Sequence, residues 1–149
     1  MMICIVSAQF SPNGTSDVLR ELALLPIDSP LTVKHWIVKP SILFSSLSAK
    51  DQRTTQFLER HHHRISWYAG DYTMEDVRLG IQNCQVIICN SYQTQRFLKK
   101  LLPNAMILCI NTRSLAKLSP PYKHISCPHK HSDSHCALQC VYKLYSLLN

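Results

Sequence analysis

The first third of the chain alternates short apolar runs with turn signals, a pattern that is typical of β-strands. The runs are "MICIVSAQ" (2–9), "DVLRELALL" (17–25) and "LTVKHWIV" (31–38). Between the first two runs, "SPNG" (11–14) combines a proline with Asn-Gly and predicts a tight turn. Between the second and third, "PIDSP" (26–30) contains two prolines, which a continuous helix does not accommodate. This part of the sequence predicts a three-stranded antiparallel meander.

The pattern then changes to helical spacing. Residues 46–63 are polar with sparse apolar positions, which predicts a surface helix preceded by a serine cap. In "GDYTMEDVRLGIQNC" (70–84), Thr73 is followed three residues later by Asp76, the spacing of a capping box. Two apolar residues about one helical turn apart, Val77 and Ile81, follow it, so we expect a second helix here.

The rest of the chain alternates apolar runs with helical segments. "QVIICN" (85–90) and "AMILCIN" (105–111) predict buried strands, and "SYQTQRFLKKLL" (91–102) predicts a helix. Residues 113–126 predict an irregular connection, and a last amphipathic helix is expected from about Ser134. Continuous apolar strands separated by helices favour parallel pairing. We therefore expect one α/β domain over 1–149, with a mixed five-stranded sheet, an antiparallel meander followed by parallel strands, covered by helices.

Composition adds a preference for anionic partners. The 149 residues are 46% hydrophobic, and sixteen Lys and Arg against nine Asp and Glu give a formal charge of +7. Such a charge suits nucleic acid, although it also serves solubility alone. The apolar runs are far shorter than the roughly 18 to 20 residues of a membrane span, and no signal-peptide pattern is present. We expect no membrane contact and a cytoplasmic or nuclear location.

Cysteines and histidines cluster just before the last helix, in "SCPHKHSDSHCALQC" (126–140). Zinc prefers thiolate and imidazole ligands, and structural sites often take one close pair from a loop and another from a helix start. Cys127 with His129 or His131 forms a candidate loop pair, and His135 or Cys136 lies at the helix start. Cys136 and Cys140 share a helix face, so Cys140 is an alternative fourth ligand. A chance crowding of histidines and thiols is the competing interpretation.

"RHHHRISW" (60–67) is the second conspicuous segment. Arg60, His62, Arg64 and Trp67, with the neighbouring Tyr68, suggest a basic and aromatic surface that contacts phosphates and stacks on bases. Further candidate phosphate contacts are Lys99 and Lys100, which form the only adjacent Lys/Arg pair. A solvated helix end is the alternative interpretation of the histidine run.

The order of elements resembles the ribonuclease-H-like fold, and in particular the DnaQ-like (DEDDh-type) 3′–5′ exonucleases. The sharpest local match is "HCALQCVYKLYSLL" (135–148), which is similar to the last exonuclease motif. His135 and Ala137 match that motif, while Cys140 stands where the family has an aspartate. The retained Asn90 in "IICNSYQTQRFL" is similar to the middle motif.

The resemblance also implies that the metal-binding carboxylates are gone. Ser7 and Gln9 stand at the aspartate and glutamate positions of the first strand, and Thr94 stands near the acid of the middle motif. With Cys140, all four acids are replaced, and these side chains do not neutralise two Mg²⁺ ions. We therefore expect a pseudoenzyme without a Mg²⁺ site, in which Ser7, Gln9, Thr94, His135 and Cys140 are relic positions.

A narrower resemblance is to the Maelstrom domain and to similar uncharacterised insect proteins. These share the fold, lack the catalytic acids and carry a Glu-Cys-His-Cys zinc constellation. The positions that would correspond are Glu21, Cys127, His129 or His131, and Cys136, although the spacing from histidine to the last cysteine is shorter here. The resemblance implies a structural Zn²⁺ ion.

These observations predict a catalytically degenerate exonuclease-like domain that binds RNA or single-stranded nucleic acid and is stabilised by a Cys/His zinc site. One alternative is a protein-interaction module or suppressor in an RNA-silencing pathway. Another is an RNA nuclease with a non-standard site. Fold resemblance alone does not decide among them.

Overall fold

The computed structural model describes residues 2–110 and 136–148. Nine strands and helices are described in these residues, with the predicted order of types. They are β1 (Ile3–Asn13), β2 (Ser16–Pro26), β3 (Lys34–Ile37), α1 (Ala49–His61), α2 (Met74–Ile81), β4 (Val86–Cys89), α3 (Tyr92–Leu101), β5 (Met106–Cys109) and α4 (Ala137–Leu148). Short 3-10 turns precede β3 at Pro30–Thr32 and α1 at Phe44–Ser46.

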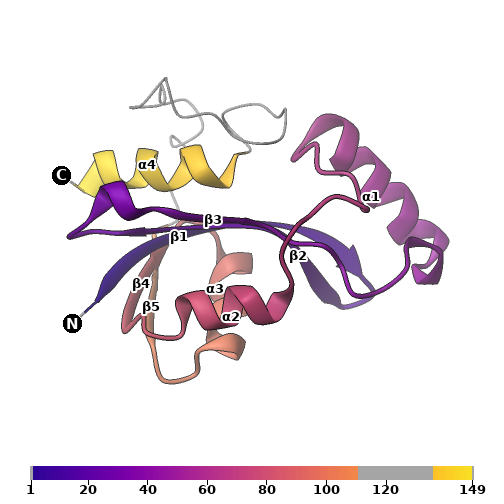
Figure 1. Ribbon diagram of the computed structural model, residues 1–149. Helices are drawn as coiled ribbons and strands as arrows, with labels where there is room; N and C mark the ends of the chain where they lie inside the picture. Colours follow the sequence, from indigo (N-terminus) through magenta and orange to yellow (C-terminus); the bar gives the residue numbers. More distant parts are fainter. Residues whose placement is uncertain (1, 111–135, 149) are drawn as a thin grey trace.

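The strands form one mixed five-stranded sheet in the order β3-β2-β1-β4-β5 (Figure 1). β1 pairs with β2, and β2 with β3, in antiparallel fashion. β4 runs parallel to both β1 and β5. The prediction of an antiparallel meander followed by parallel strands is confirmed, and the arrangement is an α/β fold consistent with a ribonuclease-H-like architecture.

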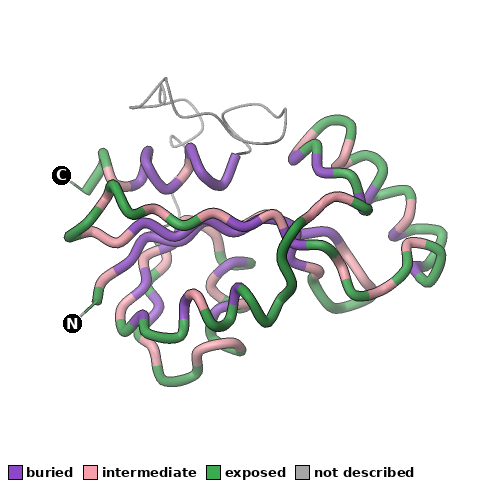
Figure 2. The backbone as a smooth tube through the Cα atoms, viewed as in Figure 1, coloured by how far each residue is buried: buried purple, intermediate pink, exposed green. Residues whose placement is uncertain are grey.

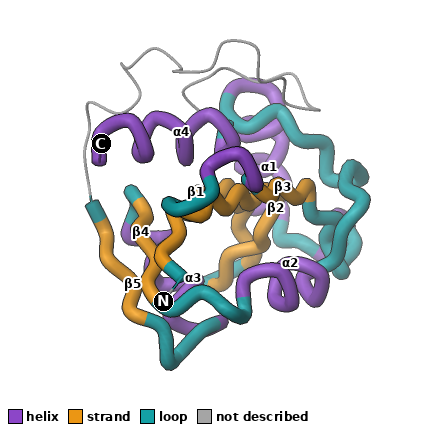
Figure 3. The backbone as a smooth tube through the Cα atoms, turned by 60° about the vertical axis from the view of Figure 1, so that its left-hand side comes forward, coloured by secondary structure: helices purple, strands orange, loops and turns teal. Residues whose placement is uncertain are grey.

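Helices cover both sides of this sheet. α4 and α1 lie on one side, and α2 and α3 lie on the other, as two views of the molecule agree (Figures 1 and 3). We call these sides the α1/α4 face and the α2/α3 face. Successive residues of a strand point to opposite faces. Accordingly, Cys4 and Val6 join the core under α2 and α3, whereas Ile5 packs in the cluster that contains α4.

The hairpin that joins β1 to β2 differs from the prediction. The expected turn at 11–14 lies further on, at Gly14 and Thr15 between the paired Asn13 and Ser16, and Pro12 belongs to β1, opposite Asp17. Proline lacks the N–H that a central strand needs, but only the first three residues of β1 pair with β4. Pro12 therefore interrupts no ladder with a third strand. β3 is also shorter than predicted, because Pro30–Thr32 forms a 3-10 turn before it.

The capping box at the start of α2 was predicted correctly, and the serine cap expected before a helix over 46–63 is found at Ser48, because α1 begins only at Ala49. The Ser48 side chain accepts the Asp51 N–H at the start of α1, and Thr73 and Asp76 form the expected reciprocal capping box at the start of α2. Ser91 caps α3 in the same way. Among the described residues, no helix combines the length and the apolar character that crossing a bilayer requires.

The α2/α3 face is closed by apolar packing. Phe10 and Phe97 meet edge to face, with ring centroids 5.3 Å apart. Gly80 lets α2 approach β3, because a Cβ at this position would clash with the ring of Trp36. The middle of β1 and β2 and most of α4 are buried, whereas α1 is largely exposed along its outer side (Figure 2). The sheet thus separates this apolar layer from the layer on the α1/α4 face, which also contains buried polar side chains.

Candidate functional site

Buried polar side chains gather on the α1/α4 face of the sheet. Ser7 and Ser11 occupy alternate positions of β1, and Glu21 of β2 lies opposite Gln9. Ser7, Ser11 and Glu21 expose 3%, 1% and 0% of their surface. Burying a polar group costs free energy unless it is hydrogen-bonded. A row of such groups on one face therefore marks a candidate site.

The Glu21 carboxylate connects three elements of this face. Its Oε2 lies 2.6 Å from Nε2 of His35 in β3, and its Oε1 accepts the backbone N–H of Ala137 at 3.1 Å. Ala137 is the first residue of α4, where the helix dipole favours a negative charge. Glu21 thus ties the start of α4 to the sheet. His35 was not anticipated from the sequence, because its meeting with Glu21 depends on the register of β2 and β3.

Two relic positions of the exonuclease motifs come together beside Glu21. Cys140, one turn into α4, is in hydrogen-bond contact with the Ser7 side chain. Burial raises the pKa of the Cys140 thiol to about 11, although Ser7 and the charge of Lys143 act in the opposite direction. Cys140 is therefore protonated at neutral pH and is not an activated nucleophile.

The other relic positions lie apart from this contact. Gln9 is half-buried and lines a hollow of about 300 Å³ together with His62 and Gln93. Thr94 is part of the α3 cap, since its N–H donates to Ser91 Oγ at 3.1 Å and its Oγ1 accepts from the same hydroxyl at 2.8 Å. His135 lies outside the described residues.

The predicted zinc ligands are only partly within the described residues. Glu21 and Cys136 are both buried, and each lies close enough to Cys140 to raise the pKa of its thiol. The remaining candidates, Cys127, His129 and His131, lie outside the described residues. In residues 2–110 and 136–148, no group of three or more His, Cys, Asp or Glu side chains is arranged to hold a metal ion. The described donors supply thiolate and carboxylate chemistry but not a complete coordination set.

Trp67 is not a base-stacking residue, contrary to the prediction from the sequence. It is 3% exposed, and its indole N–H donates to the carbonyl of Ile42 at 3.1 Å. Its ring lies under the guanidinium of Arg20, 5.2 Å from the ring centroid. The ring therefore has no free face for a base, whereas the neighbouring Tyr68 is 72% exposed.

Arg20 explains this burial and was missed in the sequence. It is fully buried and donates four hydrogen bonds to backbone carbonyls. These carbonyls belong to Val38, Ser66, Trp67 and Ala69. Burial lowers the pKa of Arg20 to about 10, while the charge of Glu59 raises it, so the side chain stays charged at neutral pH. Arg20 is one of two charged residues inside the apolar run "VLRELALL", and this position was the signal available for its contacts with the loop after α1.

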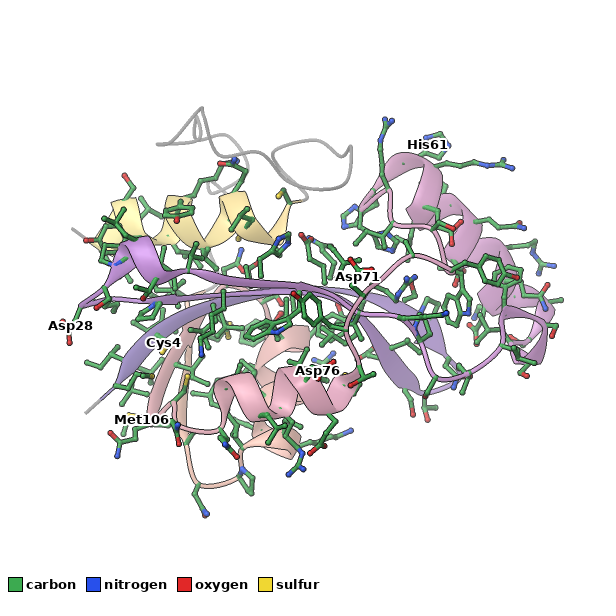
Figure 4. The ribbon with its side chains drawn as sticks, viewed as in Figure 1. Cys4, Asp28, His61, Asp71, Asp76 and Met106 are labelled. Atoms are coloured by element: carbon green, nitrogen blue, oxygen red, sulfur yellow. The ribbon has the colours of Figure 1, made fainter. Side chains whose placement is uncertain are left out.

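α1 turns a basic stripe toward solvent. At about 100° per residue, the five exposed members of this stripe fall within an arc of about 100° on the helix. They are Lys50, Arg53, Phe57, Arg60 and His61, and we call them the basic arc. The Phe57 ring is 60% exposed and lies 5.0 Å from the His61 ring, centroid to centroid. In Figure 4, His61 and neighbouring side chains of α1 extend away from the sheet.

Both acids of α1 point to the protein instead. Asp51 accepts the N–H of Gly14 at 2.7 Å, and Glu59 accepts the N–H of Trp67 at 2.7 Å. Asp51 therefore holds the β1–β2 hairpin, and Glu59 holds the loop after α1. The solvent side of α1 is left with positive charges only. Of the basic arc, only Arg60 was among the predicted binding residues. Lys50, Arg53, Phe57 and Arg60 are three, four and three residues apart in the sequence, and this helical spacing was a signal for the other members of the basic arc.

The remaining predicted nucleic-acid contacts occupy two different surfaces. Arg64 is exposed just beyond α1, and His62 is half-buried beside the basic arc. Lys99 and Lys100 are also exposed, but they end α3 on the α2/α3 face. The structure therefore does not join the lysine pair to the surface around Arg60.

The histidine run at the end of α1 is not uniformly solvated. His63 is fully buried, and its Nδ1 accepts the N–H of Ile65 at 3.0 Å. Because Nδ1 is an acceptor, Nε2 carries the proton and donates toward Ser11 Oγ at 3.3 Å. His63 therefore fastens the end of α1 to β1.

Comparison with protein-family models and with curated proteins finds no match for this chain. The functional assignment therefore depends on the geometry of the α1/α4 face and of the basic arc.

Proposed function

We propose that the chain is a non-catalytic domain that binds single-stranded nucleic acid, RNA foremost, through the basic arc of α1. The observation that carries the proposal is the segregation of charge on this helix. Lys50, Arg53 and Arg60 face solvent, while Asp51 and Glu59 are turned inward and hydrogen-bonded. Positive groups in a row track a phosphate backbone, because each neutralised phosphate releases a counterion.

The exposed aromatic side chain favours a single strand over a duplex. Phe57 lies within the basic arc, 60% exposed, in contact with His61. An aromatic ring stacks on a base only when the base is not already stacked between neighbours, as in loops and single strands. A duplex would present phosphates to this surface but no unstacked base for Phe57.

A polar hollow beside the basic arc supports a second contact. Its polar walls are Ser11 and Gln9 of β1, Thr54 of α1, His62, Gln93 and Asp17, and Phe10, Pro12 and Leu58 complete it. The amide, hydroxyl and imidazole groups donate and accept hydrogen bonds and suit base edges or sugar hydroxyls, while the Asp17 carboxylate accepts a hydrogen bond from the Gln93 amide at 2.9 Å. Gln9 is a relic position of the first exonuclease motif, so the bound strand would approach the former active site.

The same proposal implies that the strand is bound and not cut. Ser7 meets a protonated Cys140, Gln9 is an amide, and Thr94 is committed to the cap of α3. These groups do not hold a pair of divalent cations, and without such ions the standard phosphodiester mechanism has no nucleophile.

Fluorescence anisotropy with a short labelled RNA tests the proposal. We expect binding at low salt that weakens as salt rises, with a slope near −2 for about three phosphate contacts to a single strand. The same sequence as a duplex should bind more weakly. Failure to bind the single strand at low salt, or equal affinity for the duplex, would contradict the proposal.

The same samples separate the alternatives. Cleavage of the labelled RNA that a chelator abolishes would favour a nuclease. If the chain captures a protein partner and does not bind RNA, an interaction module would be favoured.

A second proposal concerns zinc at the entry to α4. Cys136, with Cys127 and His129 or His131, would hold a structural Zn²⁺ ion, and Glu21 or Cys140 would complete the set. The burial of Glu21 and Cys136 and their electrostatic proximity to Cys140 support this proposal. Such an ion would offset the cost of ordering the chain before α4.

Elemental analysis of untagged protein tests the zinc proposal. We expect one zinc per chain, lost in Cys136→Ser and retained in Cys109→Ser, a matched thiol on β5. Protein without zinc, or zinc that Cys136→Ser leaves unchanged, would contradict it.

A further inference from the structure

Cys4 and Cys84 are in contact although 80 positions separate them in the sequence. Cys4 lies in β1, where Figure 4 labels it, and Cys84 follows α2. Their sulfur atoms are 3.2 Å apart, and the two residues are 0% and 5% exposed. A disulfide has a sulfur–sulfur distance of about 2.05 Å. The two sulfurs therefore need to approach by only about 1.2 Å to bond.

One of the two cysteines borders a surface hollow. Cys84 lines a surface hollow of about 430 Å³ between the end of α2 and the start of β5. The other residues around it are Gln82, Asn83, Gln85, Leu102, Asn104 and Ala105. A small polar molecule that enters this hollow lies beside Cys84, whereas Cys4 is fully buried and does not line it.

The local electrostatics assign different roles to the two sulfurs. The Cys4 thiol can donate a hydrogen bond to a Cys84 thiolate, and with the charge of Lys34 this lowers the pKa of Cys84. The same coupling and burial raise the pKa of Cys4. The Lys34 ammonium is positioned by a hydrogen bond to the carbonyl of Gly80 at 3.4 Å. Cys84 is thus the more nucleophilic sulfur, and Cys4 keeps its proton.

We propose that Cys4 and Cys84 form a reversible disulfide when the protein meets a peroxide. The Cys84 thiolate attacks one peroxide oxygen, the O–O bond breaks, and a sulfenic acid forms while the leaving hydroxide takes a proton and becomes water. The Cys4 sulfur then attacks the Cys84 sulfur. The S–S bond forms, the S–O bond breaks, and the hydroxyl leaves as water with the Cys4 proton. In total, two thiols lose two electrons and one peroxide becomes two waters.

A second pair of thiols provides an internal comparison. Cys89 and Cys109 are paired in register on β4 and β5. Burial and the neighbouring Cys109 raise the pKa of Cys89 to about 12, so Cys89 is a poor nucleophile at neutral pH. Peroxide should therefore oxidise Cys4 and Cys84 selectively.

The new bond would tie β1 to the segment between α2 and β4. Both cysteines belong to the core of the α2/α3 face, away from the basic arc. Oxidation should therefore leave RNA affinity unchanged, so this inference stands or falls separately from the proposed function.

Differential labelling of the whole chain tests the inference. The protein is treated with mild hydrogen peroxide and unfolded in urea with iodoacetamide, which blocks the remaining free thiols. It is then reduced and labelled with N-ethylmaleimide, and tandem mass spectrometry locates the second label. We expect Cys4 and Cys84 to gain the second label in equal amounts, while Cys89 and Cys109 carry the first.

Two single substitutions and the unreduced digest complete the test. Cys84→Ser should abolish the second label on Cys4, and Cys109→Ser should leave it unchanged. If Cys84→Ser fails to fold, the unreduced digest of the wild-type protein still decides, because a linked Cys4–Cys84 peptide is either present or absent. Absence of that peptide while other thiols oxidise, or second label on Cys4 that survives Cys84→Ser, would overturn the inference.

Discussion

The two faces of the sheet are built from the same strands but differ in how many polar side chains they bury. On the α2/α3 face, β1 contributes Cys4, Val6 and Phe10 to an apolar core. On the α1/α4 face, the same strand contributes the buried polar residues Ser7 and Ser11. Both faces are stabilised by apolar burial, since a second apolar cluster lies under α4, but only the α1/α4 face adds a row of buried polar groups that can recognise a ligand.

The polar groups of the α1/α4 face are tied to elements far apart in the sequence. Glu21 binds His35 and the start of α4, and His63 links the end of α1 to Ser11. Each link offsets the cost of removing a polar group from water. A natural sequence departs from the simple apolar pattern chiefly where function requires it. This difference between the faces directs the proposed function to the α1/α4 side.

The largest expected effect is on the apolar face. Leu22→Ala should lower the free energy of unfolding by about 3 kcal/mol, because Leu22 is fully buried and its removal leaves a cavity. Urea unfolding measures the change. Leu79→Ala on α2, where the side chain is 53% exposed, is the matched control and should change stability by less than about 0.5 kcal/mol. Equal effects of the two substitutions would contradict the placement of Leu22 in the stabilising core.

A smaller loss is expected on the polar face. Glu21→Gln should cost about 2 kcal/mol, because it removes a charged acceptor from His35 and from the Ala137 N–H. A double-mutant cycle with His35→Gln measures the coupling between the two side chains. Strictly additive losses would show that the pair does not act as a unit.

Alkaline pH should lower the free energy of unfolding through Cys89, a residue in the core of the α2/α3 face. The pKa of Cys89 in the folded protein is about 12, above the ordinary 9.0, so its contribution to stability is complete below pH 9 and is lost as pH rises toward 12. Over that range one such group gives a slope of up to about 1.4 kcal/mol per pH unit. Cys89→Ala should flatten the pH dependence of the unfolding free energy, whereas Ile87→Val, a neighbour that does not titrate, should not. An unchanged slope in Cys89→Ala would contradict the interpretation.

Local signals in the sequence predicted most of the fold. Short apolar runs between turn signals indicated the strands, and Thr73 with Asp76 marked the start of α2, because a capping box depends only on residues within one turn. Pro12 was placed in the turn because its place in β1 depends on which strands lie beside it. Which strands neighbour β1 is decided by the tertiary fold and not by the residues around Pro12.

The site was less predictable for the same reason. The sequence predicts Trp67 as a surface aromatic residue, and the buried Arg20 from a distant strand explains why it is covered. The Glu21–His35 contact needs the register of two strands. The basic arc, in contrast, follows from helical spacing alone, and it was overlooked because the histidine run next to it was more conspicuous.

The most direct test of the account compares two pairs of substitutions with the same loss of charge. Arg53→Gln/Arg60→Gln removes two positive charges from the basic arc, and Lys99→Gln/Lys100→Gln removes two from the α2/α3 side; all four side chains are exposed. We predict that the first pair weakens single-stranded RNA binding about tenfold and reduces the salt slope by about 1.4, as for two lost phosphate contacts. The second pair should leave both quantities nearly unchanged. Equal losses in the two variants, or no loss in the first, would contradict the assignment of binding to α1.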